Sequence, residues 1–159
     1  MMSRACLSLL SATIALLACF DATAEEKQTW GFADGGAVVS LSYAVPESDV
    51  GTISINCQPK RKRLELVSFV LPPKQRRGAV LKIKLDSGAA RLEYDGKVGR
   101  DRDGGSYVEA RIGFDRRLFD FLGTGSTLIV EVAGAKENIP LVGIAQLLAT
   151  MRRACLGGA

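Results

Sequence analysis

Two cysteines limit the folds open to this chain more than any other feature of the sequence. The chain has four cysteines, but Cys6 and Cys19 lie in an N-terminal segment that we expect to be removed. Cys57 and Cys155 then remain as a pair, and an oxidising compartment joins such a pair in a disulfide. That bridge would close most of the mature chain, and in the chain-entropy model a loop of about 100 residues contributes on the order of 4.7 kcal/mol. The alternative is two unrelated buried thiols.

The first 24 residues have the three-part layout of a secretory signal peptide. Arg4 supplies a positive charge, residues 5–20 carry none, and Ala22-Thr23-Ala24 offers small side chains before the polar Glu25. The uncharged stretch is too short to span a bilayer comfortably. We therefore expect a signal peptide over residues 1–24, cleavage after Ala24, export to the periplasm and a single β-rich domain over residues 25–159.

A second feature of the N-terminal segment predicts a different cellular location. Leu16-Leu17-Ala18-Cys19 resembles the lipobox of bacterial lipoproteins, in which the cysteine is acylated and becomes the mature N-terminus. A lipoprotein anchored through Cys19 is therefore the alternative to a soluble periplasmic protein. A short membrane anchor is less favoured, because no second basic cluster follows the apolar run as a stop signal.

The mature chain has room for one hydrophobic core. About 135 residues remain after cleavage, enough for one domain and too few for two comfortable ones. Cleavage removes one base, Arg4, and one acid, Asp21, so the formal net charge stays at +4. A charge of this size permits contact with anionic glycans, lipid headgroups or acidic proteins without identifying any of them.

Short runs of alternating apolar and polar residues, separated by turn residues, follow one another along the mature chain. This pattern is typical of an antiparallel sheet with one solvated face. The run at 52–57 alternates most clearly and places Ile53, Ile55 and Cys57 on one face. The predicted strands are Thr29–Phe32, Ala37–Val45, Thr52–Cys57, Leu64–Leu71, Val80–Leu85, Ala90–Tyr94, Tyr107–Phe114, Leu128–Val132 and Asn138–Val142.

Three segments between or within these strands carry further signals. Leu64–Leu71 is apolar in both phases of the alternation, which indicates a central strand or a bulge. Asp95-Gly96 is the dipeptide that best supports a two-residue hairpin turn, so we expect a turn there. Arg116–Leu122, closed by a glycine, predicts a short helical turn.

The last segment of the chain changes its period. Ile144, Leu147, Leu148, Met151 and Cys155 recur at the spacing of one helical face. Cys155 therefore shares the stripe that must dock on the sheet, and Cys57 lies on the inward face of a strand. The sequence predicts a mainly β fold, an antiparallel β-sandwich or a partly open barrel, with a C-terminal α-helix clamped to it.

The sequence offers no catalytic signature. Histidine is absent, which excludes a Ser-His-Asp or Cys-His site and any metal centre held by histidine. Neither Ser-x-x-Lys nor Gly-x-Ser-x-Gly occurs. A carboxylate-only glycan hydrolase stays open, although Asp101 and Asp103 alternate with arginines in a Gly-rich turn and predict a solvated loop. We expect no catalytic residue, no metal and no cofactor.

Two basic runs flank the apolar segment Leu64–Leu71. One interpretation is that their charges keep an aggregation-prone strand soluble. The functional interpretation is an anion-binding rim for an envelope glycan, lipid headgroups or an envelope protein, with no nucleic acid as partner and no integral membrane segment after processing. An eight-residue strand spans roughly 25 Å, so the runs would lie at opposite ends of the sheet. The candidate residues are Lys60, Arg61, Lys62, Arg63, Lys74, Arg76 and Arg77.

Several segments together resemble a group of small, mostly uncharacterised proteobacterial periplasmic proteins. They are Trp30-Gly31, Tyr43–Asp49, Cys57 on a strand, Ile139–Gly143 and the last helix ending at Cys155. More loosely, the chain is similar to the invasion-associated locus B family, with its C-terminal strand, helix and cysteine. The resemblance implies a β-sandwich in the periplasm and carries no catalytic residue.

A second, shorter resemblance concerns Ser87-Gly88-Ala89-Ala90-Arg91, which is similar to the Ser-Gly loop of periplasmic C-type lysozyme inhibitors. In that family a tyrosine follows the arginine, whereas Leu92 follows here.

Taken together, these sequence features predict a non-enzymatic exported binding or envelope-associated protein. The alternatives are a periplasmic lysozyme inhibitor and a carboxylate-only glycan hydrolase.

Overall fold

The computed structural model describes residues 27–156. The predicted signal peptide over 1–24, its cleavage site, Cys6 and Cys19 lie outside the described residues. Within 27–156 the elements are β1 (Thr29–Asp34), β2 (Val39–Ala44), β3 (Gly51–Gln58), the 3-10 helix η1 (Pro59–Arg61), β4 (Arg63–Ser68), β5 (Val80–Asp86), β6 (Arg91–Arg100), β7 (Ser106–Gly113), α1 (Arg116–Leu122), β8 (Thr127–Val132), β9 (Ala135–Pro140) and α2 (Ile144–Leu156).

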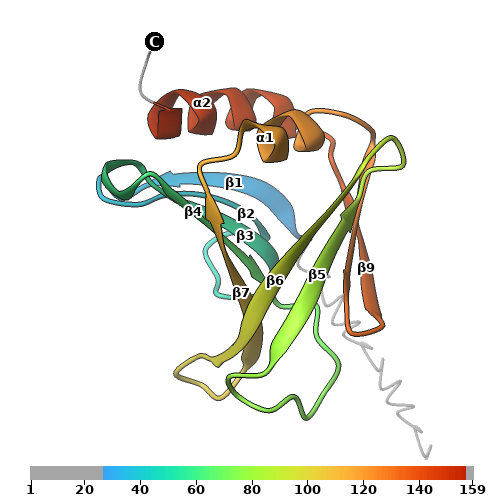
Figure 1. Ribbon diagram of the computed structural model, residues 1–159. Helices are drawn as coiled ribbons and strands as arrows, with labels where there is room; N and C mark the ends of the chain where they lie inside the picture. The colour runs from blue at the N-terminus through green and yellow to red at the C-terminus, as the bar shows by residue number, and fades with distance from the viewer. Residues whose placement is uncertain (1–26, 157–159) are drawn as a thin grey trace, which may run out of the picture.

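All nine strands belong to one sheet in the order β1-β2-β3-β4-β7-β6-β5-β8-β9. Every neighbouring pair is antiparallel. The sheet curls around its inward face, and α1 and α2 lie across one end of it (Figure 1). The predicted mainly β fold with a C-terminal helix is confirmed. The strands form a single curled sheet that is not closed, so the partly open barrel is the better description of the two arrangements predicted.

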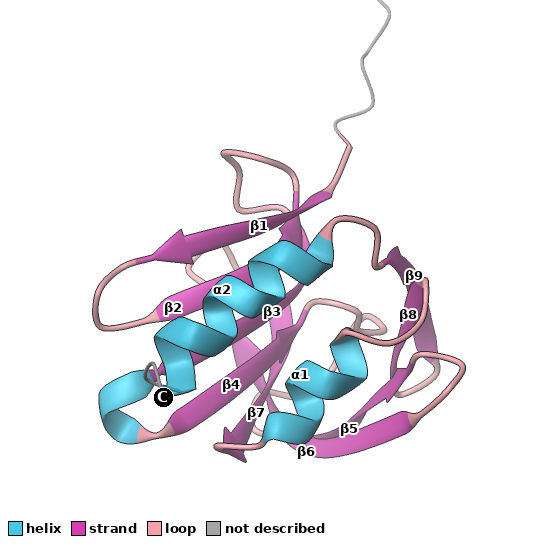
Figure 2. Cartoon of the chain, turned by 90° about the horizontal axis from the view of Figure 1, so that it is seen from above, coloured by secondary structure: helices cyan, strands magenta, loops and turns pink. Residues whose placement is uncertain are grey.

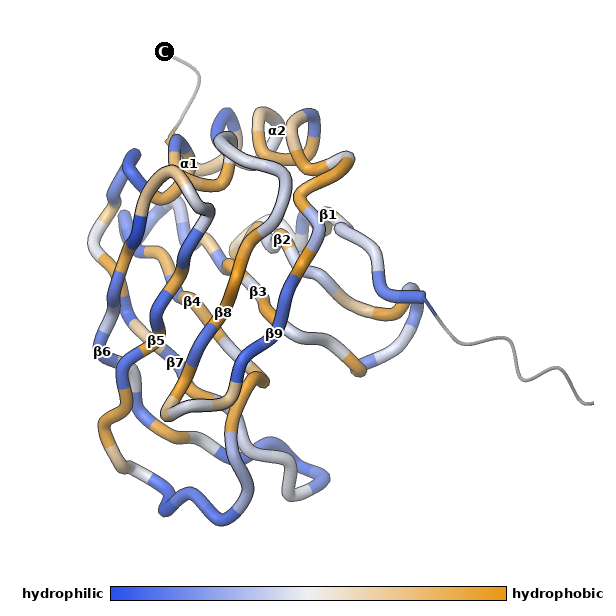
Figure 3. The backbone as a smooth tube through the Cα atoms, turned by 90° about the vertical axis from the view of Figure 1, so that its right-hand side faces the viewer, coloured by the Kyte–Doolittle hydropathy of each residue, from blue (hydrophilic) through white to orange (hydrophobic). Residues whose placement is uncertain are grey.

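One hydrophobic core fills the concave side of the sheet. Ile53, Ile55 and Cys57 are buried as their alternation predicts, and they meet Leu41 from β2 and Val130 from β8 in the same cluster. The alternation of apolar and polar residues is visible along the strands in Figure 3. Period-two patterning therefore fixes which face of each strand turns inward.

The two edge strands approach each other at one point. Trp30 of β1 donates a hydrogen bond from its indole Nε1 to the carbonyl oxygen of Pro140 in β9, over 2.7 Å. The Trp30 ring also lies against the Tyr43 ring, with centroids 5.5 Å apart. Because β1 and β9 are the first and last strands of the sheet, this contact joins the edges without a backbone ladder between them.

The C-terminal helix α2 lies across one end of the sheet (Figure 1). Helix α2 packs on β1 and β2 (Figure 2). Four of the five residues of the predicted stripe, Ile144, Leu148, Met151 and Cys155, are buried, and the fifth, Leu147, is half-buried. Cys155 is bonded to Cys57, with their Cα atoms 6.0 Å apart. The predicted disulfide is confirmed, and it fastens the last turn of α2 to the end of β3.

The predicted hairpin turn at Asp95-Gly96 is wrong. Strand β6 runs through both residues to Arg100, and the turn to β7 comes at Asp101–Gly105. Gly96 is buried, and a side chain on it would come within 3.1 Å of the carbonyl oxygen of Glu109. The glycine is thus explained by the close approach of β7 and not by a turn.

A different dipeptide makes a two-residue hairpin turn. Ala133 and Gly134 connect β8 to β9 with φ angles of 48° and 90°, and Val132 pairs directly with Ala135. Positive φ at both central residues is the geometry of a type I′ turn. The predicted strand over 138–142 therefore begins earlier, at Ala135, and ends at Pro140.

The predicted strand over Leu64–Leu71 is shorter than expected. Strand β4 ends at Ser68, whose hydroxyl accepts a hydrogen bond from the backbone N–H of Val70 over 3.2 Å. Leu64 and Leu66 face the core, while Phe69 is exposed. The strand is nevertheless central, since β3 and β7 flank it.

The short helical turn predicted at 116–122 is confirmed as α1. Asp115 caps it by accepting a hydrogen bond from the backbone N–H of Arg117.

Replacing Cys57 or Cys155 with serine should lower the free energy of unfolding by about 2–5 kcal/mol, because the bridge restricts the unfolded chain and fastens α2. Urea unfolding of the mature oxidised protein and of each variant measures the change. Two free thiols, titrated in unfolded but unreduced wild-type protein, would contradict the bridge.

Replacing Trp30 with phenylalanine should lower the free energy of unfolding by about 1 kcal/mol or more, since an aromatic ring stays but the bond to Pro140 and part of the indole surface are lost. Tyr43→Phe is the control: it also keeps its ring, and the Tyr43 hydroxyl makes no hydrogen bond to the described residues. An equal loss of stability in both variants would mean that the indole hydrogen bond does not hold the edges together.

Candidate functional site

The two basic runs lie at opposite ends of β4. Lys60, Arg61 and Lys62 form η1 and the turn beside α2, next to the disulfide. Lys74, Arg76 and Arg77 belong to the loop between β4 and β5, at the end of the sheet away from the helices (Figure 1). Strand β4 has six residues, which corresponds to about 20 Å.

The first run is displayed by a tight turn. Pro59 begins η1, and the backbone N–H of Lys62 donates to the carbonyl oxygen of Pro59 over 3.1 Å. Lys62 has a φ of 47°, a left-handed conformation that costs a residue with a Cβ roughly 1–2 kcal/mol. Lys60, Arg61 and Lys62 are all exposed. The turn thus holds three successive cations in solvent at the expense of local backbone strain.

The second run sits on a loop that is tied to β6. The N–H of Gly78 donates to the carbonyl oxygen of Val98 over 2.8 Å, and the N–H of Val98 donates to Ala79 over 2.9 Å. The guanidinium of Arg100 reaches the carbonyl oxygen of Gln75 at 3.4 Å. Hydrophilic residues gather in the loops at this end of the sheet (Figure 3). The loop is therefore anchored while its cations stay exposed.

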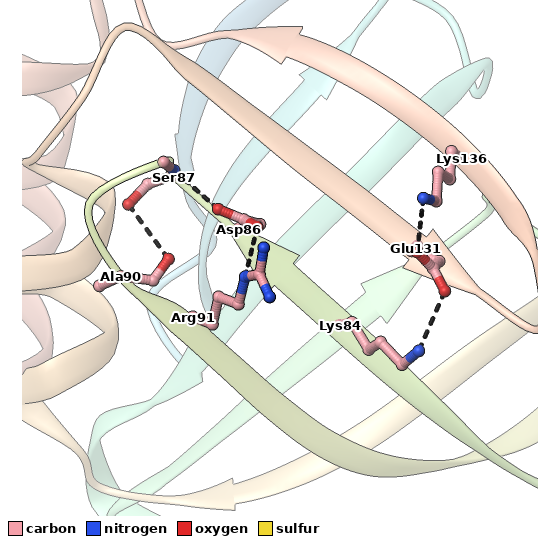
Figure 4. Close-up of polar contacts among 8 residues, drawn as sticks. Lys84, Asp86, Ser87, Ala90, Arg91, Glu131 and Lys136 are labelled. Carbon is pink, nitrogen blue, oxygen red and sulfur yellow. Dashed lines mark hydrogen bonds and ion pairs between the residues drawn. The ribbon is translucent and has the colours of Figure 1, made fainter.

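Several charges on the outer face of the sheet are paired, whereas six of the seven residues of the two runs make no ion pair within residues 27–156. Glu131 accepts Lys84 and Lys136, each over 3.0 Å (Figure 4), and Lys82 pairs with Asp95 at 3.1 Å. The members of the runs that make no ion pair within residues 27–156 are Lys60, Arg61, Lys62, Lys74, Arg76 and Arg77.

Arg63 differs from the other predicted anion-binding residues. Its Nη2 lies 2.8 Å from a carboxylate oxygen of Glu65 and 3.1 Å from the amide oxygen of Gln58. Its Nε is buried without a partner among the described residues. The Arg63 side chain is therefore part of the outer face of β4, and its charge is already engaged.

A hollow beside the second run brings together residues that the sequence analysis did not connect. It lies on the outer face of β6 and β7, measures about 510 Å³ and is lined by Arg77, Gly78, Asp95, Lys97, Val98, Gly99, Tyr107, Glu109 and Arg111. The wrong turn at Asp95-Gly96 separated these residues in the predicted topology. The alternation of apolar and polar residues could have predicted that they share a face, because it places residues 95, 97, 107, 109 and 111 on outward positions of two strands.

A second hollow, of about 570 Å³, lies between α1 and α2. Phe119, Leu148 and Ala149 give it a largely apolar surface. Its Arg152 is paired with Asp120, which leaves Arg153 as a cation of this hollow that makes no ion pair within residues 27–156. The hollow on β6 and β7 is the better candidate because it combines free cations with hydrogen-bonding groups.

The turn that resembles the lysozyme-inhibitor loop is held by its own contacts (Figure 4). Ser87 is buried and its hydroxyl donates to the carbonyl oxygen of Ala90 over 3.5 Å. Asp86 accepts from the N–H of Gly88 over 2.7 Å and from Arg91 over 2.6 Å. These two donors, first the N–H of Gly88, lower the pKa of the Asp86 carboxyl.

The described residues give no sign of a metal or a membrane span. Within 27–156 no group of three or more Cys, Asp or Glu residues is arranged to hold a metal ion. No helix in that part of the chain is long and apolar enough to cross a bilayer. Asp101 and Asp103 lie in an exposed turn in which Asp101 accepts from the N–H of Gly105 over 2.6 Å.

Comparison of the chain with protein-family models, with curated proteins and with solved structures finds no match. The resemblance to the invasion-associated locus B family therefore stays a prediction.

The free energy of unfolding should be constant between about pH 5 and 8, because the chain has no histidine. The pKa values of Asp86, Asp115 and Glu131 are lowered by hydrogen bonds from backbone, arginine and lysine donors. A lowered pKa contributes stability that is lost as the pH falls below the ordinary values of 3.8 and 4.5. Burial raises the pKa of Tyr94, so stability should fall again as the pH rises above 10.0. Urea midpoints across this range measure the profile, and a step near pH 6.5 would contradict it.

Proposed function

We propose that this chain is a non-enzymatic binding protein of the bacterial periplasm that holds an extended acidic glycan of the envelope. The observation that carries the proposal is the contrast in charge pairing. Lys60–Lys62 and the loop with Lys74, Arg76 and Arg77 expose cations that make no ion pair among residues 27–156, while lysines on the outer face of β5 and β9 are paired.

The distance between the two groups favours a polymer over a small ligand. They are separated by the length of β4, about 20 Å, whereas the screening length at physiological salt is about 8 Å. Each group therefore attracts its own segment of a chain. Two weak contacts made by one polymer reinforce each other, since the second contact is intramolecular once the first has formed.

The backbone supports a binding role for these cations. Lys62 and Lys74 both have positive φ, 47° and 66°, which a lysine adopts only at a cost that glycine would not incur. Residues kept in strained conformations gather at functional sites. A solubilising charge alone would not require lysine at these two turn positions.

Export and a non-enzymatic role complete the proposal. The layout of residues 1–24 and the Cys57–Cys155 bridge support an oxidising compartment, and the resemblance to periplasmic proteins that the sequence predicts implies the same location. The carboxylates in the hollow, Asp95 and Glu109, are already paired with Lys82 and Arg111. Neither has the apolar surroundings of a glycosidase general acid.

The test compares two variants with the same loss of charge. One carries Gln in place of Arg61, Lys62, Lys74 and Arg76, and the control carries Gln in place of Lys84, Arg91, Arg117 and Lys136. The control residues are engaged in exposed ion pairs, each worth about 0–1 kcal/mol, so both variants should fold. Affinity for polygalacturonate should fall by about tenfold or more in the first variant, equivalent to about 1.4 kcal/mol, and much less in the control.

Equal loss in both variants would mean that net charge alone drives binding, and no loss would mean that the runs only solubilise the strand. Binding to anionic phospholipid vesicles but not to the glycan would replace the polymer with a membrane surface. Inhibition of lysozyme in a lysis assay, or release of new reducing ends from the glycan, would favour the inhibitor or the hydrolase instead.

A further inference from the structure

We infer that the hollow on the outer face of β6 and β7 holds one carboxylated sugar unit of the acidic glycan. This inference rests on the proposed function and adds to it a site and a ligand unit. Nothing in the two basic runs themselves distinguishes a sugar from any other anion. The hollow supplies an aromatic surface, free cations and hydrogen-bond acceptors within one space of about 510 Å³.

The aromatic surface comes from Tyr107. It pairs with Gly99 across β6 and β7, and the far end of its ring fills the space that a side chain on Gly99 would need. Phe69 supports it from the side, with ring centroids 6.2 Å apart. The ring is therefore laid across the neighbouring strand and forms part of the lining, where the apolar face of a pyranose can pack.

The cations come from two different elements. Lys97 projects from the outward side of β6, and Arg77 is placed beside it by the loop whose next residue, Gly78, is bonded to Val98. Neither forms an ion pair within the described chain, whereas Arg111 is engaged by Glu109 at 3.0 Å. A guanidinium and an ammonium left free at one rim suit a carboxylate, which the planar guanidinium can bind through two hydrogen bonds.

The acceptors decide between a sugar acid and a bare anion. The carboxylates of Asp95 and Glu109 also line the hollow. Each is paired with one cation, and an ionised carboxylate has further lone pairs that can accept from hydroxyl groups. Phosphate or citrate offers few such donors and would be repelled by these groups. A uronic acid offers hydroxyls for the acceptors and a carboxylate for the cations.

The size and position of the hollow fit an internal unit of a chain. A volume of about 510 Å³ lies within the roughly 300–1,000 Å³ of small-molecule sites. Arg77 belongs both to the hollow and to the second basic run, so a polymer drawn to the loop passes directly over β6 and β7. The run would supply attraction, and the hollow would select the unit.

Three probes separate the contributions in the mature oxidised protein. Trigalacturonate has rings and carboxylates, maltotriose has rings only, and citrate has carboxylates only. Titrations followed by backbone amide NMR should show trigalacturonate shifting Gly99 and Tyr107, with an affinity about tenfold or more above that of either other probe. Citrate binding as well as trigalacturonate at these residues would overturn the inference, because the ring would then contribute nothing.

Four variants test whether trigalacturonate binds in the hollow. Lys97→Gln and Tyr107→Leu should each weaken trigalacturonate about fivefold or more, since a charge or the aromatic surface is lost. Tyr107→Phe restores an aromatic ring and should bind trigalacturonate more tightly than Tyr107→Leu. Lys136→Gln removes a cation from β9, outside the hollow, and should bind within about twofold of wild type. Undiminished binding by Lys97→Gln and Tyr107→Leu, with folding confirmed by the amide spectrum, would contradict the site.

The two proposals fail in different ways. If trigalacturonate binds nowhere near Gly99 while polygalacturonate is still lost in the variant with Gln at 61, 62, 74 and 76, which leaves Arg77 in place, the hollow is rejected and the basic runs stand. If that variant keeps its affinity for the polymer while Lys97→Gln loses trigalacturonate, the hollow is the primary site and the role of the runs is rejected.

Discussion

The bond between Cys57 and Cys155 is the constraint on which the arrangement of this domain depends. It joins the end of β3 to the last turn of α2, and so holds the helix across the end of a sheet that is not closed by its own strands. Gln58 alone separates Cys57 from η1. The same bond therefore fixes where the turn with Lys60, Arg61 and Lys62 stands relative to the sheet.

The opposite end of the sheet is organised by hydrogen bonds instead of a covalent bond. The loop with Lys74, Arg76 and Arg77 lies along β6 because Gly78 and Ala79 exchange backbone bonds with Val98. Between these two ends, the outer face carries a ladder of paired charges such as Lys84 and Glu131. Many charges on the outer face are thus balanced, while the cations of the two turns, and Lys97 on β6, make no ion pair within residues 27–156.

Sequence patterns were sufficient wherever one period dominated. Alternation placed Ile53, Ile55 and Cys57 inward, and helical spacing placed Met151 and Cys155 on the buried stripe, because burying an apolar face leaves one choice of register.

Patterns failed where glycine had two possible roles. Asp95-Gly96 has the composition of a turn, yet Gly96 is needed for the close approach of β7, and the left-handed turn was made by Ala133-Gly134. The hollow lined by Tyr107 depends on which strands are neighbours, and the order β4-β7-β6-β5 cannot be obtained from local spacing. The ion pair of Arg63 with Glu65, by contrast, joins two residues on the same face of one strand.

The central claim is that exposed, unpaired cations hold an acidic polymer, and its most direct test is the salt dependence of wild-type binding. Raising the salt from about 0.1 M to about 1 M shortens the screening length from about 10 Å to about 3 Å. Retention of the mature oxidised protein on immobilised polygalacturonate should therefore fall steeply and continuously over that range. Retention that does not change with salt would contradict the account, because a contact between exposed charges cannot be indifferent to screening.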